Sequence, residues 1–314
     1  MSKLFIEDLA LEGKRALIRV DFNVPQDKST GAITNTKRIE AALPTIKYAL
    51  DKGAAVILMS HLGRPDGKVM PQYSLARVAT ALEGLLGRPV KFLPDCVGPE
   101  VEAACAKIKP GEVILLENLR FHLEEEGKGT VTAADGTVSK IKANPEDVKA
   151  FRASLTRLAD VYINDAFGTA HRDHSSMVGV PEILGSDKTA AGFLLMKEIE
   201  YLSNKLANPA KPFVTIMGGA KVSDKIQLIT NLLAKVDTLL IGGAMSYTFM
   251  KANGKGIGGS KVEADKLDLA KEIQAKAAAA KVRFELPVDF VCGKEFDANT
   301  ETKIVEGEIP DGWQ

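Results

Sequence analysis

The chain has 314 residues, enough for two domains, and its 45% hydrophobic and 26% charged residues are typical of a soluble globular protein. Lys and Arg together number 41, as do Asp and Glu, and this balance argues against a general nucleic-acid or membrane-binding protein. No stretch resembles a signal peptide or a membrane span, so we expect a cytoplasmic protein. The three cysteines fit neither a disulfide framework nor a zinc ribbon, and we expect buried structural thiols at Cys96, Cys105 and Cys292.

Five near-continuous apolar runs in the first half predict strands that are buried on both faces of a parallel sheet. They cover residues 16–22, 55–60, 90–93, 112–119 and 161–167. The segments between them carry apolar residues at spacings of three and four, which predicts helices. Strands that alternate with helices in this way indicate a doubly wound α/β domain.

The pattern changes after residue 186, where residues 189–212 read as one longer helix that ends in a Pro- and Asn-rich break. A second alternation follows, with about three strands and an Ala/Lys-rich solvated helix at 262–281. We therefore expect two Rossmann-like domains joined by a helix, the second with few strands for its core. The expected bounds are 1–186, a connector at 187–206, and 207–314.

Basic and polar residues follow the strands of the first half, where ligands of open α/β sheets bind. Arginines come after three successive strands, and converging guanidinium groups recognise phosphate and carboxylate by paired hydrogen bonds. The pattern predicts a site for a small, multiply charged anion. Its candidate residues are Asp21, Asn23, Arg38, His61, Arg64, Arg120 and Arg172. An Asx-type turn at Asp21 and merely solvated arginines remain open as plainer interpretations.

A metal site at His171, Asp173 and His174 is a weaker interpretation, because their spacing fits no strong zinc signature. The stretch IMGGAKVSDK (216–225) gives a clearer signal, since it reads as a strand, a glycine turn and a helix start with two lysines. Such a turn is where open α/β sheets hold phosphates, although it is not the P-loop pattern.

Six motifs in register along the chain together closely resemble phosphoglycerate kinases. They are RVDFNVP (19–25), SHLGRPDG (60–67), LLENLRF (115–121), NDAFGTAHR (164–172), SSMVGVP (175–181) and MGGAKVSDKIQLI (217–229). The similarity extends from residue 4 to residue 313. It implies transfer of a phosphoryl group between the acyl phosphate of 1,3-bisphosphoglycerate and ADP, giving 3-phosphoglycerate and ATP.

The resemblance also implies roles for the residues that match these motifs. In the N-terminal domain Asp21 and Asn23 would bind the glycerate, and Arg38 would lie nearest the transferring group. The 3-phosphate would be held by His61, Arg64, Arg120 and Arg172. The C-terminal domain would bind ATP or ADP with Mg²⁺, through Gly219, Ala220, Lys221, Lys225, Gly242 and Gly243. Asp224 is a weak candidate to approach the magnesium ion.

Such a site needs no general base, because the attacking carboxylate or phosphate oxygen is already ionised at neutral pH. Its task is to position the substrates and to neutralise charge on the transferred group, for which Arg38 and Lys221 are the catalytic candidates. Because the two substrates would lie on separate domains, the domains are expected to close, with the connector helix as hinge.

Family members continue beyond the GWQ at the end of this sequence, with a further glutamate for the ribose and a late glycine-rich loop for magnesium. The second domain is therefore expected to be incomplete. The alternative to an active kinase is a phosphoglycerate-binding fragment without turnover. The family further implies a monomer, with no nucleic-acid or membrane partner.

Overall fold

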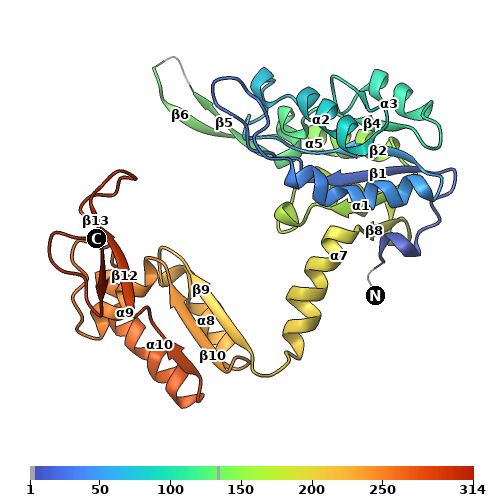
Figure 1. Cartoon of the computed structure of the whole chain (residues 1–314). Helices are drawn as coiled ribbons and strands as arrows, with labels where there is room; N and C mark the ends of the chain where they lie inside the picture. Colours follow the sequence, from blue (N-terminus) through green and yellow to red (C-terminus); the bar gives the residue numbers. More distant parts are fainter. Residues whose placement is uncertain (1–3, 133–134) are drawn as a thin grey trace. The chain divides into compact units, whose positions relative to one another are not determined.

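The computed structural model describes residues 4–132 and 135–314. The chain forms two compact units, which meet between Ser203 and Asn204. Each unit contains a parallel sheet with helices packed on it (Figure 1).

The sheet of the first unit has six strands in the order β3-β4-β2-β1-β7-β8, and all neighbouring pairs are parallel. Its strands are β1 (Arg15–Val20), β2 (Ala55–Met59), β3 (Lys91–Phe92), β4 (Val113–Leu115), β7 (Val161–Asp165) and β8 (Thr189–Ala191). The chain adds β2, β3 and β4 on one side of β1 and then β7 and β8 on the other, so a switch point of the topology lies at the carboxyl ends of the central strands.

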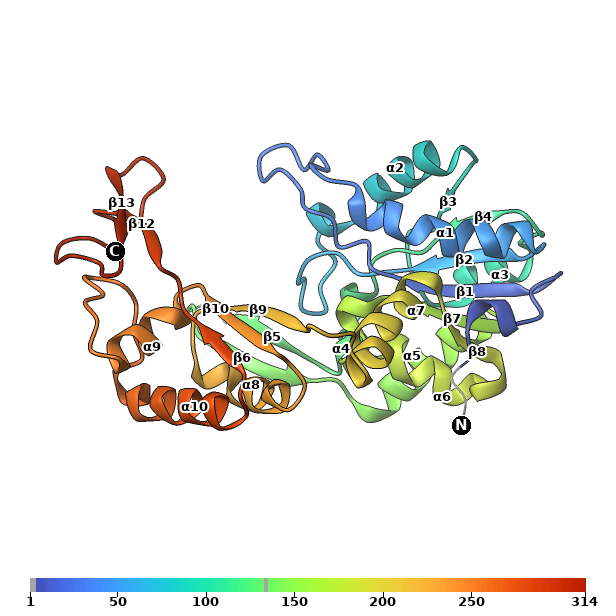
Figure 2. The same cartoon turned by 60° about the horizontal axis from the view of Figure 1, so that its bottom comes forward.

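Helices cover both faces of this sheet. In Figure 2, α1 and α2 lie on one side of β1 and β2, and α5 and α6 lie on the other. Alternate residues of each strand enter two separate cores, as Ile18 packs with α1 and α2 whereas Leu17 packs with α3 and α5. This two-sided burial is the physical reason for the continuous apolar runs in the sequence. The helices are α1 (Lys37–Asp51), α2 (Ala76–Leu86), α3 (Pro99–Ala106), α4 (Leu123–Glu126), α5 (Pro145–Arg157) and α6 (Val180–Leu184).

Two features of the first unit differ from the sequence prediction. An antiparallel hairpin of β5 (Lys128–Thr132) and β6 (Val138–Lys142) follows α4. The single helix expected from residue 189 is wrong at its start, because Thr189–Ala191 form β8 and pair with β7. The helix α7 begins only at Phe193, after the extended Gly192, and passes at Glu200 into a π-helical turn that ends at Lys205.

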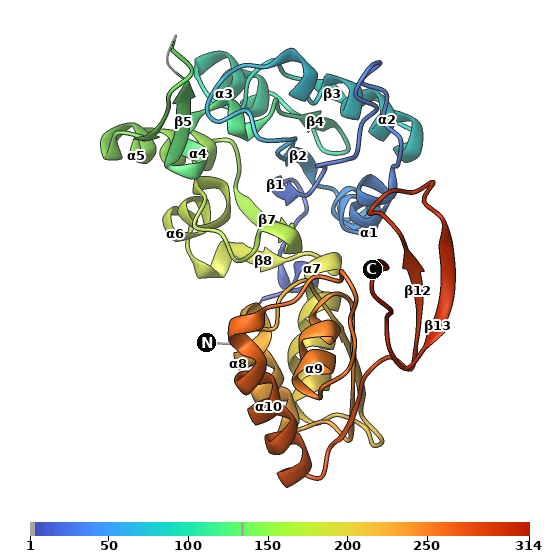
Figure 3. The same cartoon turned by 90° about the vertical axis from the view of Figure 1, so that its left-hand side faces the viewer.

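The second unit has a three-stranded parallel sheet in the order β11-β10-β9, as the number of predicted strands suggested. Figure 3 looks onto the layer of helices that packs on it. A separate antiparallel pair, β12 and β13, was not predicted. The elements are β9 (Val214–Gly218), α8 (Ile226–Leu233), β10 (Thr238–Gly242), α9 (Met245–Ala252), α10 (Leu267–Ala279), β11 (Arg283–Glu285), β12 (Asp289–Gly293) and β13 (Thr302–Glu306).

One face of the second sheet is open to solvent in the described residues. Val214 and Ile216 of β9 are 49% and 79% exposed, whereas Met217 points into the helix-covered core. Parallel sheets are normally covered on both faces. Across the described ranges, we find no helix with the length and apolar character that a membrane crossing requires.

Candidate active site

The first unit contains a basic pocket at the carboxyl ends of β1, β2, β4 and β7, with a volume of about 300 Å³. All seven substrate-binding candidates from the sequence line it. Its lining residues are Asp21, Asn23, Arg38, His61, Gly63, Arg64, Arg120, Glu126, Gly168, Thr169 and Arg172. The four adjacent strands therefore bring together side chains that are more than 150 positions apart in the sequence.

Four guanidinium groups and two carboxylates face this pocket, so it attracts anions. Asp21 forms an ion pair with Arg38, and Glu126 lies 3.2 Å from Arg120. Arg120 also donates to the carbonyl of Gly63 at 2.8 Å, while its Nε is buried without a partner among the described residues. Burial lowers the pKa of Arg120, because desolvation disfavours its charged form. An anion in the pocket would offset that cost.

The turn after β1 combines two of the interpretations that the sequence left open. Asp21 Oδ1 accepts the backbone N–H of Asn23 at 3.3 Å, as in an Asx-type turn, while its other oxygen pairs with Arg38. Asn23 Oδ1 accepts the N–H of Gly63 at 2.9 Å and thereby fixes the loop after β2. In the described part of the chain, the side-chain amide nitrogen of Asn23 donates no hydrogen bond.

His61 is held from behind by a buried network that the sequence analysis missed. Arg19 on β1 is fully buried, and its Nη2 lies 3.2 Å from His61 Nδ1. Because a guanidinium can only donate, Nδ1 accepts and the ring proton is on Nε2. Desolvation, followed by the charge of Arg19, lowers the pKa of His61 well below its usual range. His61 is therefore a neutral residue that can donate from Nε2 into the pocket.

The carboxylate of Glu125 balances the charge of Arg19, and the hydroxyl group of Ser176 links the two. Its Nε donates to Ser176 Oγ at 2.9 Å, and Ser176 donates to the buried Glu125 at 2.6 Å. Glu125 also accepts the N–H of Ser176 at 2.9 Å. An arginine within the apolar run of residues 16–22 was a sequence signal for a buried charge, but it did not indicate which residues balance it.

The two histidines considered as metal ligands differ in their surroundings. His171 is exposed, whereas His174 is buried, with its Nε2 3.4 Å from Glu126 Oε1. Desolvation, with the nearby charge of Arg120, lowers the pKa of His174 to about 3. Within residues 4–132 and 135–314, these side chains are not among the groups of metal-ligating atoms that lie close together.

In the second unit, the two predicted glycine turns pack against each other. Gly219, Ala220 and Lys221 follow β9, and Gly242 and Gly243 end the neighbouring β10. Gly243 has a φ of 67°, and a Cβ there would lie 3.0 Å from the backbone of Gly219. Only glycine fits this close approach.

Two lysines, Lys221 and Lys225, precede the start of α8. Lys221 is exposed and Lys225 is partly buried, while Asp224 between them is exposed. Glu263, which the sequence analysis missed, accepts the N–H groups of Val222 and Ser223 at 2.6 and 3.1 Å. Desolvation would raise the pKa of Glu263, but hydrogen bonds led by that from Ser223 outweigh it and lower the pKa.

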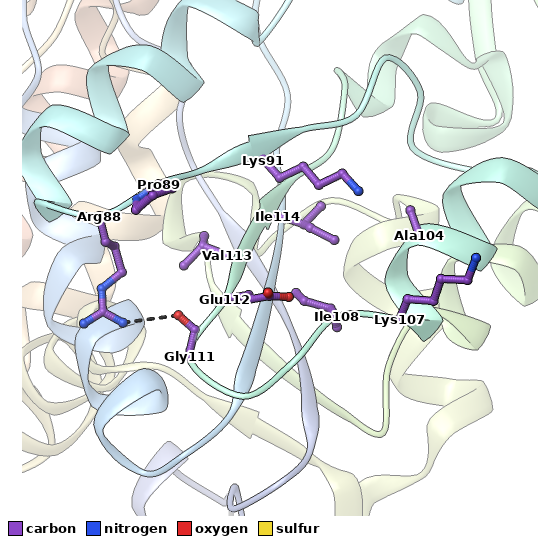
Figure 4. A pocket seen from close by; sticks show the side chains of 10 residues that line it. All are labelled: Arg88, Pro89, Lys91, Ala104, Lys107, Ile108, Gly111, Glu112, Val113 and Ile114. Carbon is purple, nitrogen blue, oxygen red and sulfur yellow. Dashed lines mark hydrogen bonds between the residues drawn. The ribbon is translucent and has the colours of Figure 1, made fainter.

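A cavity of about 880 Å³ adjoins the second glycine turn, with Gly243, Ala244, Tyr247 and Lys261 among its lining residues. Another cavity, of about 460 Å³, lies in the first unit at the amino ends of β3 and β4. There Arg88, Lys91 and Lys107 surround an apolar floor, and Arg88 donates to the carbonyl of Gly111 (Figure 4). This cavity is at the end of the sheet opposite to the basic pocket.

Comparisons with known proteins agree with this geometry. The family profile described as phosphoglycerate kinase matches residues 6–314. The chain belongs to the phosphoglycerate kinase family. It is 57% identical to phosphoglycerate kinase 1 of Rhizopus niveus over 100% of this chain, and 54% identical to the phosphoglycerate kinase of Dictyostelium discoideum over 99% of this chain. Each match spans 73% of the relative's own length. The structure of the phosphoglycerate kinase of Coxiella burnetii superposes with a TM-score of 0.77 at 37% identity, covering 99% of this chain and 73% of that one.

The family assignment gives the chemistry. Phosphoglycerate kinases are glycolytic kinases that transfer a phosphoryl group between 1,3-bisphosphoglycerate and ADP, to give 3-phosphoglycerate and ATP. The parallel α/β sheets agree with the expected fold class. Substrates of this kind are phosphorylated anions and a nucleotide, which suits a basic pocket and a glycine-rich turn on two different sheets.

Proposed function

We propose that the basic pocket of the first unit binds 3-phosphoglycerate and 1,3-bisphosphoglycerate. The supporting observation is the convergence of four arginines on one cavity: Arg64, Arg120 and Arg172 follow three strands, and Arg38 lies in the first turn of α1. Their forked donors suit a phosphate and a carboxylate. Asp21 and Asn23 provide an acceptor and a donor for the hydroxyl and carboxylate of the glycerate, and neutral His61 donates from Nε2.

The glycine turns of the second unit bind ATP or ADP in this proposal. Gly219, Ala220 and the N–H groups nearby approach the phosphates, while Gly242 and Gly243 border the cavity for the adenine. Lys225 holds the nucleotide end. Mg²⁺ enters as part of the nucleotide substrate, and the single exposed carboxylate of Asp224 fits an ion that takes most of its ligands from phosphates and water.

Catalysis rests on charge neutralisation. Arg38 is half exposed at the rim of the basic pocket, and Lys221 is exposed beyond β9. Both cations stabilise the negative charge that spreads over the transferred phosphoryl group, and no residue needs to remove a proton. The two units close around the substrates, with the helix from Phe193 to Lys205 as hinge, which excludes water from the acyl phosphate.

We also propose that the protein is a cytoplasmic monomer with no nucleic-acid partner. The equal numbers of acidic and basic residues and the three free, buried cysteines support this setting.

A coupled turnover assay with 3-phosphoglycerate, ATP and Mg²⁺ tests the proposal. Lys221→Ala and Arg38→Ala should each lower turnover about 100-fold or more, with affinity for the substrate changed less than about tenfold. Lys251→Ala is the matched control, because Lys251 is an exposed lysine of the same unit on α9. Unchanged turnover in Lys221→Ala would remove that residue from the transition state.

A second function, phosphoglycerate binding without turnover, is favoured by the exposed face of β9. It predicts normal binding of 3-phosphoglycerate by the folded chain, no turnover, and no binding of ATP. Measuring both ligands on the same sample distinguishes the two functions.

A further inference from the structure

Outside the basic pocket, three side chains of different chemistry converge on the loop after β3. Asp95 and Cys96 lie between β3 and α3, and His122 lies between Arg120 and α4. One oxygen of Asp95, the sulfur of Cys96 and one ring nitrogen of His122 all lie within 4.8 Å of one another. Neither the family reaction nor the basic pocket uses these residues.

The positions suit a tetrahedral ion after a small adjustment. Zinc bonds of about 2.0–2.3 Å place neighbouring ligand atoms roughly 3.3–3.8 Å apart. Asp95 Oδ1 and His122 Nε2 are now 2.7 Å apart, so this distance would increase by about 0.6 Å. The side chain of Asp95 is 49% exposed, and its Oδ1 also accepts the N–H of Cys96 at 2.6 Å, so the movement would lengthen that hydrogen bond too. The ring of His122 packs against Phe151.

Negatively charged carboxylates surround the sulfur of Cys96. Cys96 is fully buried, and burial raises the pKa of its thiol well above the usual range, with further contributions from the charges of Asp95, Glu125 and Glu117. The same carboxylates that oppose a bare thiolate favour a divalent cation beside it. A cation that binds the sulfur would therefore be stabilised by the charges that now keep the thiol protonated.

Solvent reaches this loop. A cavity of about 430 Å³ is lined by Asp95 and by the following turn, Val97 to Val101. His122 has 29% of its side chain exposed. An ion can approach from the Asp95 and His122 side and meet the buried sulfur beneath them.

We propose that Asp95, Cys96 and His122 bind one Zn²⁺ ion, with water in the fourth position. One oxygen, one sulfur and one imidazole nitrogen select a borderline-soft divalent ion such as Zn²⁺ or Co²⁺, and they do not suit Mg²⁺. The thiol releases its proton to solvent when the Zn–S bond forms, so apparent affinity increases with pH. His122 is two residues from Arg120, which lines the basic pocket.

Cobalt spectroscopy of the untagged full chain tests this site. The chain is freed of metal with a chelator and titrated with Co²⁺ in the absence of substrates. We expect a thiolate-to-cobalt absorption band that saturates at one ion per chain and disappears when Zn²⁺ is added. Asp95→Asn and His122→Asn should each weaken Co²⁺ binding at least about tenfold. Cys96→Ser should abolish the band.

Cys105→Ser is the matched control, because Cys105 is another buried thiol of the first unit and lies on α3. Its band should equal that of the wild type. Absence of the band in the wild type would show that Asp95 and His122 form only a hydrogen bond, and would overturn the proposal. So would an unchanged affinity in both Asp95→Asn and His122→Asn, which decide the matter even if Cys96→Ser does not fold.

Discussion

The buried charge of Arg19 gives the sharpest prediction about stability. Arg19 and Glu125 are both almost completely buried. The hydroxyl group of Ser176 joins them, because it accepts from Arg19 at 2.9 Å and donates to Glu125 at 2.6 Å. Glu125→Gln keeps the shape of the side chain but removes the charge that balances the guanidinium. Removing one partner of a buried ion pair leaves the other uncompensated and typically costs about 3–5 kcal/mol. We expect a loss of that size in the free energy of unfolding of the first unit.

A double-mutant cycle measures this coupling. Because burial raises the pKa of Glu125, Glu125→Gln, Arg19→Met and the double variant are unfolded in denaturant at about pH 8, well above the usual range of a carboxyl group. Circular dichroism follows the transition, and Trp313, the single tryptophan, reports the second unit as an internal reference. The double variant should lose at least about 2 kcal/mol less than the sum of the single variants.

Glu124→Gln is the matched control, because Glu124 is the neighbouring, partly exposed residue of α4. It should change the free energy of unfolding by less than about 0.5 kcal/mol. If Glu125→Gln is as mild as this control, or if the two buried substitutions are additive, then Glu125 does not compensate Arg19 and the description of the network is incorrect.

Two further predictions concern His174 and Gly168. Because the folded state holds the pKa of His174 near 3, below its ordinary 6.5, the unfolded chain binds an extra proton between these values. As the pH falls through this range, the free energy of unfolding should therefore decrease more steeply in the wild type than in His174→Gln. The difference in slope should be up to about 1.4 kcal/mol per pH unit. The exposed His171→Gln should retain the wild-type slope in pH-dependent unfolding, and equal slopes in all three would contradict the assignment. A Cβ on Gly168 would lie 2.8 Å from Asp21 Oδ2, so Gly168→Ala should weaken 3-phosphoglycerate binding about tenfold by calorimetry, by analogy with other supporting residues. Gly84→Ala is the control and should leave the affinity for 3-phosphoglycerate unchanged, because a Cβ there meets nothing within 4 Å. Equal affinities in the two variants would show that a shift of Asp21 does not affect binding.

The sequence predicted the first sheet well because its strands are buried on two faces. Runs such as residues 55–60 have no polar face, and the structure places Val56 and Ile57 in opposite cores. The clustering of the candidate residues in the basic pocket followed from the same reasoning, because parallel strands place their carboxyl ends at one edge. The order of the strands was not needed for that inference.

Other parts depend on contacts that no local pattern encodes. Three residues of β8 are too few to show a period, and Thr189–Ala191 become a strand only because β7 offers an edge. Glu263 reaches the start of α8 from a distant loop. The partners of Arg19 lie more than 100 residues away along the chain, so the sequence alone could not show which residues compensate its charge.

The catalytic geometry itself was only partly accessible. Motif matching predicted Arg38 and Lys221 as the catalytic residues, and these two residues lie in different units. What the structure adds is the local surroundings of the candidate residues within each unit. In the first unit Asp21 orients Arg38, and in the second Gly219 and Gly243 form one compact turn pair.

Calorimetric titration of the full chain with 3-phosphoglycerate tests the central claim most directly. We predict one binding site per chain in the wild type, and binding weakened at least about tenfold in Arg64→Ala, which removes one charge-assisted contact of the basic pocket. Arg77→Ala is the control, because Arg77 lies outside the pocket and donates to the carbonyl of Thr30. Absence of binding by the folded wild type, or equal affinity in Arg64→Ala and Arg77→Ala, would contradict the assignment of the basic pocket as the phosphoglycerate site.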